Sequence, residues 1–253
     1  MRMQWLALAT VSAMAVTATA MAAVPVEASV SLTPHSAEYK VKISVLSGRL
    51  ATELRRTESG YVATHRIEPT GLANVLVGGE IFAESAFAAG AEGLRPTRYV
   101  ARDEISSDKL NADIRFDWEA GRMRGSYQTD DDDAPVNVDD ALDALVYDGV
   151  SIQYELMHDL MTSGAAAEYV LYDVDELKRL TITNIGTRRI RTPAGEFEAV
   201  GIRHQAENSS RQTTLWCVAE LDYLPVVIER HRKGKLQMRA QLKRYEPEAV
   251  SSD

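Results

Sequence analysis

The sequence has a single cysteine and fewer basic than acidic residues. Cys217 has no second cysteine to pair with, so no internal disulfide can form and the core must hold by packing alone. The chain carries 28 Lys and Arg against 37 Asp and Glu, a formal net charge of −9 at pH 7. Because nucleic-acid binding needs a basic face that neutralises phosphates, this balance argues against nucleic acid as a partner.

Long apolar runs, Pro/Gly/Ser-rich linkers and internal repeats are also missing after the first 22 residues. Those first residues follow the plan of a secretory signal peptide, with Arg2 before an apolar run and small residues at Ala20 and Ala22. We therefore expect a signal peptide at 1–22, export to the periplasm and no transmembrane segment in the mature chain. A flexible lead-in at 23–35, one β-rich domain at 36–246 and a disordered tail at 247–253 complete the predicted organisation.

Alternation of apolar and polar residues predicts strands along most of the chain. In KLQMRAQLKRY, the residues Leu236, Met238, Ala240 and Leu242 alternate with polar neighbours, which is typical of a strand with one buried face. Comparable segments recur at spacings near ten residues, separated by turn residues. The pattern predicts an all-β sandwich or barrel made of antiparallel strands.

Two segments break this alternation. In YDGVSIQYELMHDLMTSG, the residues Ile152, Leu156 and Leu160 recur at helical spacing and Gly164 follows as a stop, so we expect a helix of about three turns. The stretch TGLANVLVG at 70–78 is compatible with a second, short helix. A sheet of about ten strands must curl or split. We therefore predict a mainly β fold, a single large curved antiparallel sheet or half-open β-barrel that wraps one amphipathic helix.

Motifs for the common reaction chemistries are missing. No G-x-S-x-G elbow is present. The acidic run at 130–133 lacks the central glycine and terminal glutamate of a calcium-binding loop. His204 and His231, each beside an arginine, are expected at the rim or on the outer face of strands rather than in a zinc site. We expect no metal, no cofactor and no catalytic residue, and hence a protein that is not an enzyme.

Five segments in order resemble the DUF3108 family, whose members are exported proteins found mostly in Gram-negative bacteria. They are TGLANVLVGGEIFAESAF, FDWEAGRMRG, VSIQYELMHDLMTSG, TRRIRTPAGEFEAVGIRHQ and TTLWCVAELDYLPVVIERHRKGK. The resemblance runs from about Tyr39 to Arg239. It implies an envelope protein whose curved antiparallel sheet wraps a helix, similar in outline to the half-open barrels of lipoprotein carriers such as LolA. It implies no catalytic residue, because the family has no assigned activity.

A curved sheet with one apolar face leaves a concave interior, which is a usual place for apolar ligands. We therefore expect a non-enzymatic periplasmic protein that binds an amphiphile such as a lipid, a lipoprotein or another periplasmic protein in this groove and contributes to envelope maintenance. The residues expected near the groove, each of which fits plain core packing equally well, are Leu76, Phe82, Trp118, Tyr154 and Trp216. Two alternatives remain open: an envelope hydrolase that uses unidentified carboxylates, and a structural protein that docks a partner.

Overall fold

The computed structural model describes residues 31–44, 46–71, 73, 78–90, 93–106, 109–173 and 176–248. The expected signal peptide at 1–22 and the predicted groove residue Leu76 lie outside these residues, as does the tail from 249. So does most of the candidate short helix at 70–78.

Most of the described chain forms one sheet of 15 strands. The first eight strands are β1 (His35–Ile43), β2 (Leu46–Thr57), β3 (Gly60–Pro69), β4 (Ile81–Gly90), β5 (Gly93–Asp103), β6 (Leu110–Asp117), β7 (Arg122–Thr129) and β8 (Val136–Ala141). After β9 (Val146–Tyr147) and the helix α2 (Ser151–Thr162) come β10 (Glu168–Asp173), β11 (Glu176–Thr192), β12 (Gly195–Ala206), β13 (Arg211–Val218), the 3-10 turn η1 (Ala219–Leu221), β14 (Leu224–Arg232) and β15 (Lys235–Pro247).

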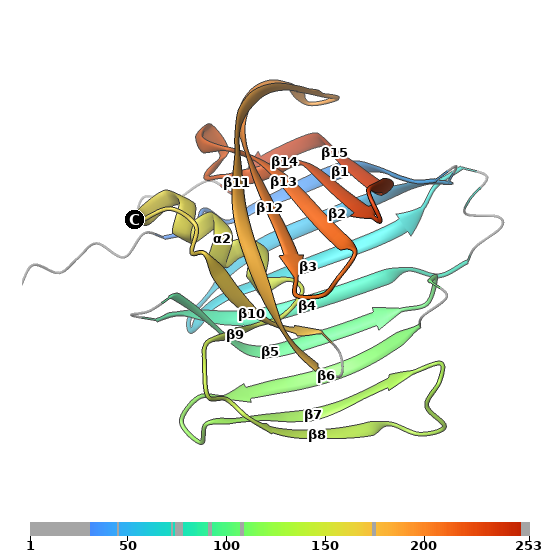
Figure 1. The fold of residues 1–253 in the computed structure, drawn as a ribbon, viewed down its shortest axis with the longest axis vertical. Coiled ribbons are helices and arrows are strands. Elements are labelled where there is room, and N and C mark those ends of the chain that lie inside the picture. Colours follow the sequence, from blue (N-terminus) through green and yellow to red (C-terminus); the bar gives the residue numbers. More distant parts are fainter. Residues whose placement is uncertain are drawn as a thin grey trace, which may run out of the picture.

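Two antiparallel meanders make up this sheet, and the first and last strands join them. The strands β1 to β8 pair in chain order, as do β10 to β15, and β1 pairs with β15 in the middle of the sheet. The short strand β9 pairs in parallel with β10 at one edge and also approaches β5 without pairing with it. The sheet therefore curls back on itself but does not close, which confirms the predicted fold class (Figure 1).

The helix α2 lies inside the curl, between β4 and β5 on one side and β10 on the other (Figure 1). Its 12 residues give the predicted three turns. Tyr154, Leu156 and Met157 are buried, while the predicted stripe residues Ile152 and Leu160 are only partly covered. No helix in the described part of the chain is both long and apolar enough to cross a membrane.

The concave inner face of the sheet and α2 share one large apolar core. Alternation along β1 places His35, Ala37, Tyr39 and Val41 on this face, and all four are buried. Leu32, within the segment expected to be a flexible lead-in, is only 1% exposed and belongs to the same core. A smaller cluster around Ile114, Phe116 and Met123 fills the space at β6 to β8. The inner face that α2 covers is thus a packed interior rather than an open channel.

Candidate functional site

The structure does not bring the predicted groove residues together. Tyr154 is part of α2 and packs in the large core, and Trp118 packs against the smaller cluster at β6 to β8. Trp216 and Phe82 lie on the face of their strands that points away from α2, because Trp216 alternates with the inward-facing Leu215 and Phe82 is in register with the outward-facing Arg66. Tyr154 and Trp118 therefore belong to two separate clusters, and the other two residues lie on the outer face.

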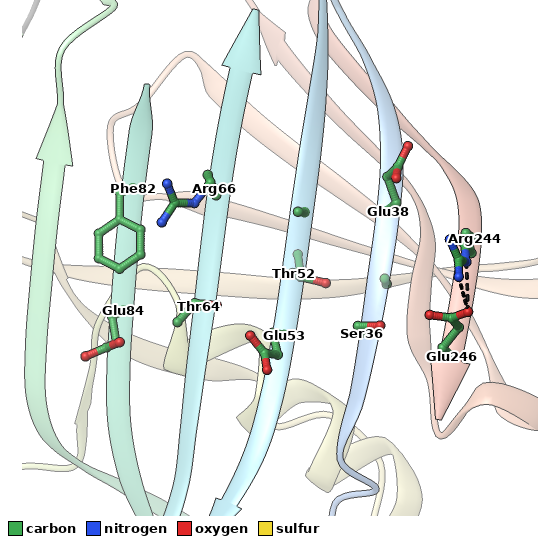
Figure 2. A pocket seen from close by; sticks show the side chains of 12 residues that line it. Ser36, Glu38, Thr52, Glu53, Thr64, Arg66, Phe82, Glu84, Arg244 and Glu246 are labelled. Atoms are coloured by element: carbon green, nitrogen blue, oxygen red, sulfur yellow. Dashed lines mark hydrogen bonds and ion pairs between the residues drawn. The ribbon is translucent and has the colours of Figure 1, made fainter. Parts of the chain in front are cut away.

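Phe82 borders a hollow of about 490 Å³ on the face opposite α2 (Figure 2). Two neighbouring cross-strand rows form its floor. One row alternates carboxylates and hydroxyls, and the other carries arginines and Phe82. The first runs Glu246, Ser36, Glu53, Thr64, Glu84, and the second includes Arg244, Glu38, Arg66 and Phe82. The wall of this hollow is therefore mainly charged and polar.

Ion pairs hold most of these charges. The Nζ of Lys243 lies 2.6 Å from a carboxylate oxygen of Glu38 and lowers the pKa of that carboxyl group. Arg66 pairs with Glu80 and also places its guanidinium 5.2 Å from the ring centroid of Phe82, while Arg244 pairs with Glu246. Exposed pairs of this kind contribute little stability and keep a surface solvated. This hollow therefore offers no place for an apolar chain.

The two tryptophans have structural contacts. Trp118 stacks on Phe116 at a centroid distance of 6.4 Å, and its indole N–H donates to the carbonyl of Pro96 on β5. Trp216 lies under β11, with the guanidinium of Arg188 3.9 Å from its ring centroid. A Cβ added at Gly201 would lie 2.7 Å from the Trp216 ring, so only glycine fits beside that indole.

Where α2 meets the inner face, several buried polar atoms have no hydrogen-bond partner among the described residues. They are Nε2 of His35, Oγ1 of Thr52, Nε2 of His65 and the hydroxyl of Tyr154. The rings of His35 and His65 each lie 6.2 Å from the Tyr154 ring, measured between centroids. Burial lowers the pKa of His35 and lowers that of His65 to about 4. Both imidazoles are therefore neutral at pH 7.

Arg230 on β14 brings a positive charge into the same interior. It lies in register with Thr213 on β13 and, through it, with His204 on β12, two residues beyond the core residue Ile202. Opposite residues in paired strands share a face, so Arg230 and His204 point inward. His204 was expected at the rim or on the outer face; it is instead on the inner face, because it alternates in phase with Ile202.

The Arg230 side chain is exposed to solvent. The protein atoms packed around it nevertheless lower the pKa of its guanidinium. Burial first, and then the charge of Arg230, lower the pKa of His204 to about 4. His65, across the interior on β3, has its pKa lowered by the same two causes in the same order. Because the charge of Arg230 acts on groups of β3 and of β12, it lies between these two parts of the curled sheet.

Beyond α2, the inner face is apolar and incompletely covered. Ile43, Leu46 and Leu236 are 43%, 37% and 49% exposed, and they lie at the tips of the β1–β2 and β14–β15 hairpins. Partly buried apolar residues continue the surface inward, namely Ile67, Ile182 and Met238. We call these six residues, together with His65, His204 and Arg230, the uncovered end of the inner face.

Carboxylates anchor α2 at the other end. Asp148 is fully buried and accepts hydrogen bonds from the Ser85 hydroxyl at 2.6 Å and from the backbone N–H groups of Val150 and Ser151. Burial raises the pKa of Asp148, and these hydrogen bonds oppose the rise. The bonds from Val150 and Ser151 satisfy backbone donors at the first turn of α2. Asp148 therefore fixes the start of the helix to β4.

The described residues contain one group of side chains with the spacing to hold a metal ion. It consists of Glu155, His158 and Asp159 on α2, whose ligand atoms lie within 4.8 Å of one another. Glu155 accepts from the backbone N–H of Leu94 at 2.7 Å, and Asp159 accepts from the Tyr169 hydroxyl at 2.5 Å. These bonds tie α2 to β5 and β10. The two carboxylates thus already have a structural role.

Comparison with known proteins places the chain in a family. Residues 35–240 match the model of the family described as "Protein of unknown function (DUF3108)", and the chain belongs to this family, as its sequence segments predicted. No curated protein matches the sequence. Among solved structures, one similar chain is a Bacteroides fragilis protein inferred to be exported and described as having a YmcC-like fold. It is 10% identical, the match covers 85% of this chain and 97% of that one, and the TM-score is 0.35.

Proposed function

We propose that this member of the family binds an amphiphile at the uncovered end of its inner face, as an exported, non-enzymatic protein of the periplasm that serves envelope maintenance. The signal-peptide pattern of residues 1–22 supports export. The sequence has no G-x-S-x-G nucleophile elbow and no zinc-ligand motif, which supports a binding role.

One observation carries this proposal: three large aliphatic side chains are exposed side by side on the concave side. Ile43 and Leu46 face each other in the β1–β2 register, and Ile43 also pairs with Met238, the inward neighbour of Leu236. Scattered exposed apolar residues are normal on a protein, but a contiguous set that continues into a concavity marks a binding surface. Fully burying a Leu or Ile side chain contributes about 1.5–3 kcal/mol, so an acyl chain that covers these residues gains substantial affinity.

The test uses a neutral amphiphile, so that it depends on apolar contact alone. We would titrate the folded protein with dodecyl maltoside below its micelle concentration and measure binding by calorimetry. The double substitution Leu46→Gln and Leu236→Gln should weaken binding about tenfold, because each removes exposed aliphatic surface without opening a core cavity. Phe82→Gln, on the other face, is the matched control and should leave binding unchanged.

Two results would overturn the proposal. One is the absence of binding by any amphiphile. The other is turnover of a phospholipid or cell-wall fraction by the purified protein that a single Asp or Glu substitution abolishes, because that outcome would assign the protein to the hydrolases.

A further inference from the structure

We propose that the amphiphile has a single chain with an anionic head group, and that Arg230 holds this head group on the inner face. The inference rests on the proposed function and names the ligand class for the same surface. Three features of the uncovered end carry it: a cation without a counter-charge among the described residues, polar groups around it, and an apolar row that begins beside it.

Arg230 has no ion pair or hydrogen bond with any other described residue. Asp173, the first carboxylate to influence its pKa, is already paired with Lys178. The Arg230 side chain is exposed to solvent and can therefore be reached by an anion, and the fold around it lowers the pKa of its guanidinium. A carboxylate or phosphate can accept two parallel N–H bonds from the planar guanidinium, which is the geometry that arginine recognises best.

Polar groups from both walls of the sheet lie near this charge. His204 lies in the same cross-strand row as Arg230, two strands away. The charge of Arg230 also lowers the pKa of His65 on β3 and acts to lower that of Tyr99 on β5. The Nε2 atom of His65 is buried and has no hydrogen-bond partner in the described part of the chain. Neutral imidazoles and a phenol can donate hydrogen bonds to an oxyanion without adding a competing negative charge.

An apolar row begins beside Arg230. Arg230 is in register with Met238 on β15 and, through it, with Ile43 on β1 and Leu46 on β2. Neighbouring strands lie about 4.8 Å apart, so this row extends roughly 14 Å from Arg230, enough for an extended acyl chain of medium length. Leu236, which is exposed two residues before Met238 on β15, borders the row.

The charge at the rim favours the same class of ligand. The β14–β15 hairpin carries Arg232, Lys233 and Lys235 next to Arg230, although the whole chain has a net charge of −9. A local positive field on an acidic protein attracts anions and repels cations. A cationic amphiphile would therefore meet repulsion at the rim and again at Arg230.

The experiment compares head groups on one chain length. The probes are dodecanoate, dodecyl phosphate, dodecyl maltoside and dodecyltrimethylammonium, each below its micelle concentration, with inorganic phosphate as a head-group-only control. For the unmodified protein we expect the two anionic probes to bind at least about tenfold more tightly than dodecyl maltoside, and neither the cationic probe nor phosphate alone to bind measurably.

Arg230→Gln should remove this anionic preference and leave the affinity for dodecyl maltoside unchanged. Arg203→Gln, which changes the neighbour of His204 on the opposite face of β12, should alter neither. Equal binding of neutral and anionic probes, or an anionic preference that survives Arg230→Gln, would overturn the inference and leave the proposed function standing. Failure of every probe to bind would overturn both. The head-group comparison on the unmodified protein decides the matter even where Arg230→Gln does not fold.

Discussion

Replacing Tyr154 by phenylalanine should stabilise the protein, although the residue is completely buried. Its ring packs on Phe87 at a centroid distance of 5.6 Å with 0% exposure, and its hydroxyl has no hydrogen-bond partner among the described residues. An unpaired buried hydroxyl costs about 1–3 kcal/mol of desolvation. Its removal should therefore raise the free energy of unfolding by about 1 kcal/mol and Tm by about 2–4 °C.

Tyr61→Phe is the matched control, with the opposite expected sign. Tyr61 is also buried and stacks on Phe87, but its hydroxyl lies 2.9 Å from Nη2 of Arg56 and 3.0 Å from Oγ of Ser31. Loss of these bonds should cost about 0.5–1.5 kcal/mol. Urea unfolding followed by circular dichroism, with an unchanged m-value, measures both variants. A Tyr154→Phe protein that is less stable than the parent by 1 kcal/mol or more would show that the hydroxyl has a partner and would refute the reasoning.

Two further predictions concern backbone geometry and acid. Gly125→Ala should destabilise the protein by about 2 kcal/mol or more in the same unfolding assay, because φ is +154° and the new Cβ would lie 2.0 Å from the carbonyl oxygen of Asp113. Gly121→Ala is the control: open space surrounds this glycine, so the substitution should cost only about 1 kcal/mol. Equal effects of the two substitutions would contradict this reasoning. His65 and His204 have folded pKa values of about 4, below the ordinary histidine value of 6.5, so the unfolded chain binds more protons between these limits and stability falls as pH drops through that window. His204→Gln should reduce the loss of stability between pH 7 and 4.5 by about 2 kcal/mol; an unchanged pH dependence would show that His204 is solvated.

Local sequence patterns predicted the strands and the helix because these patterns report burial directly. The alternation of Leu236, Met238, Ala240 and Leu242 lies within β15, and the spacing of Ile152, Leu156 and Leu160 lies within α2. The pairing of β1 with β15 leaves no such local trace, because it joins residues about 200 positions apart and depends on how the whole sheet curls.

The same limit explains why the candidate site was predicted only in part. Alternation separates the two faces of a strand but does not say what covers each face, so it does not show that Trp216 lies under β11 on the face away from α2. Phe82 alternates like a core residue and yet borders a charged hollow. Alternation in the sequence places Arg230 on the same face as Ile228, and His204 on the same face as Ile202. This becomes informative only once the strand register shows that Arg230 and His204 lie in one cross-strand row.

The meeting of β1 with β15 also governs when the fold can be completed. Until the last strand is available, β1 has a neighbour on one side only, and Tyr39, Val41 and the rest of its inner face lack the Leu242 and Ala240 contacts that the finished sheet provides. Such distant pairing is slow to form, since the chain must close a loop of almost its full length first. A chain that is still being synthesised therefore carries an unpaired β1 edge, and a truncation that removes β15 would leave that edge open to aggregation.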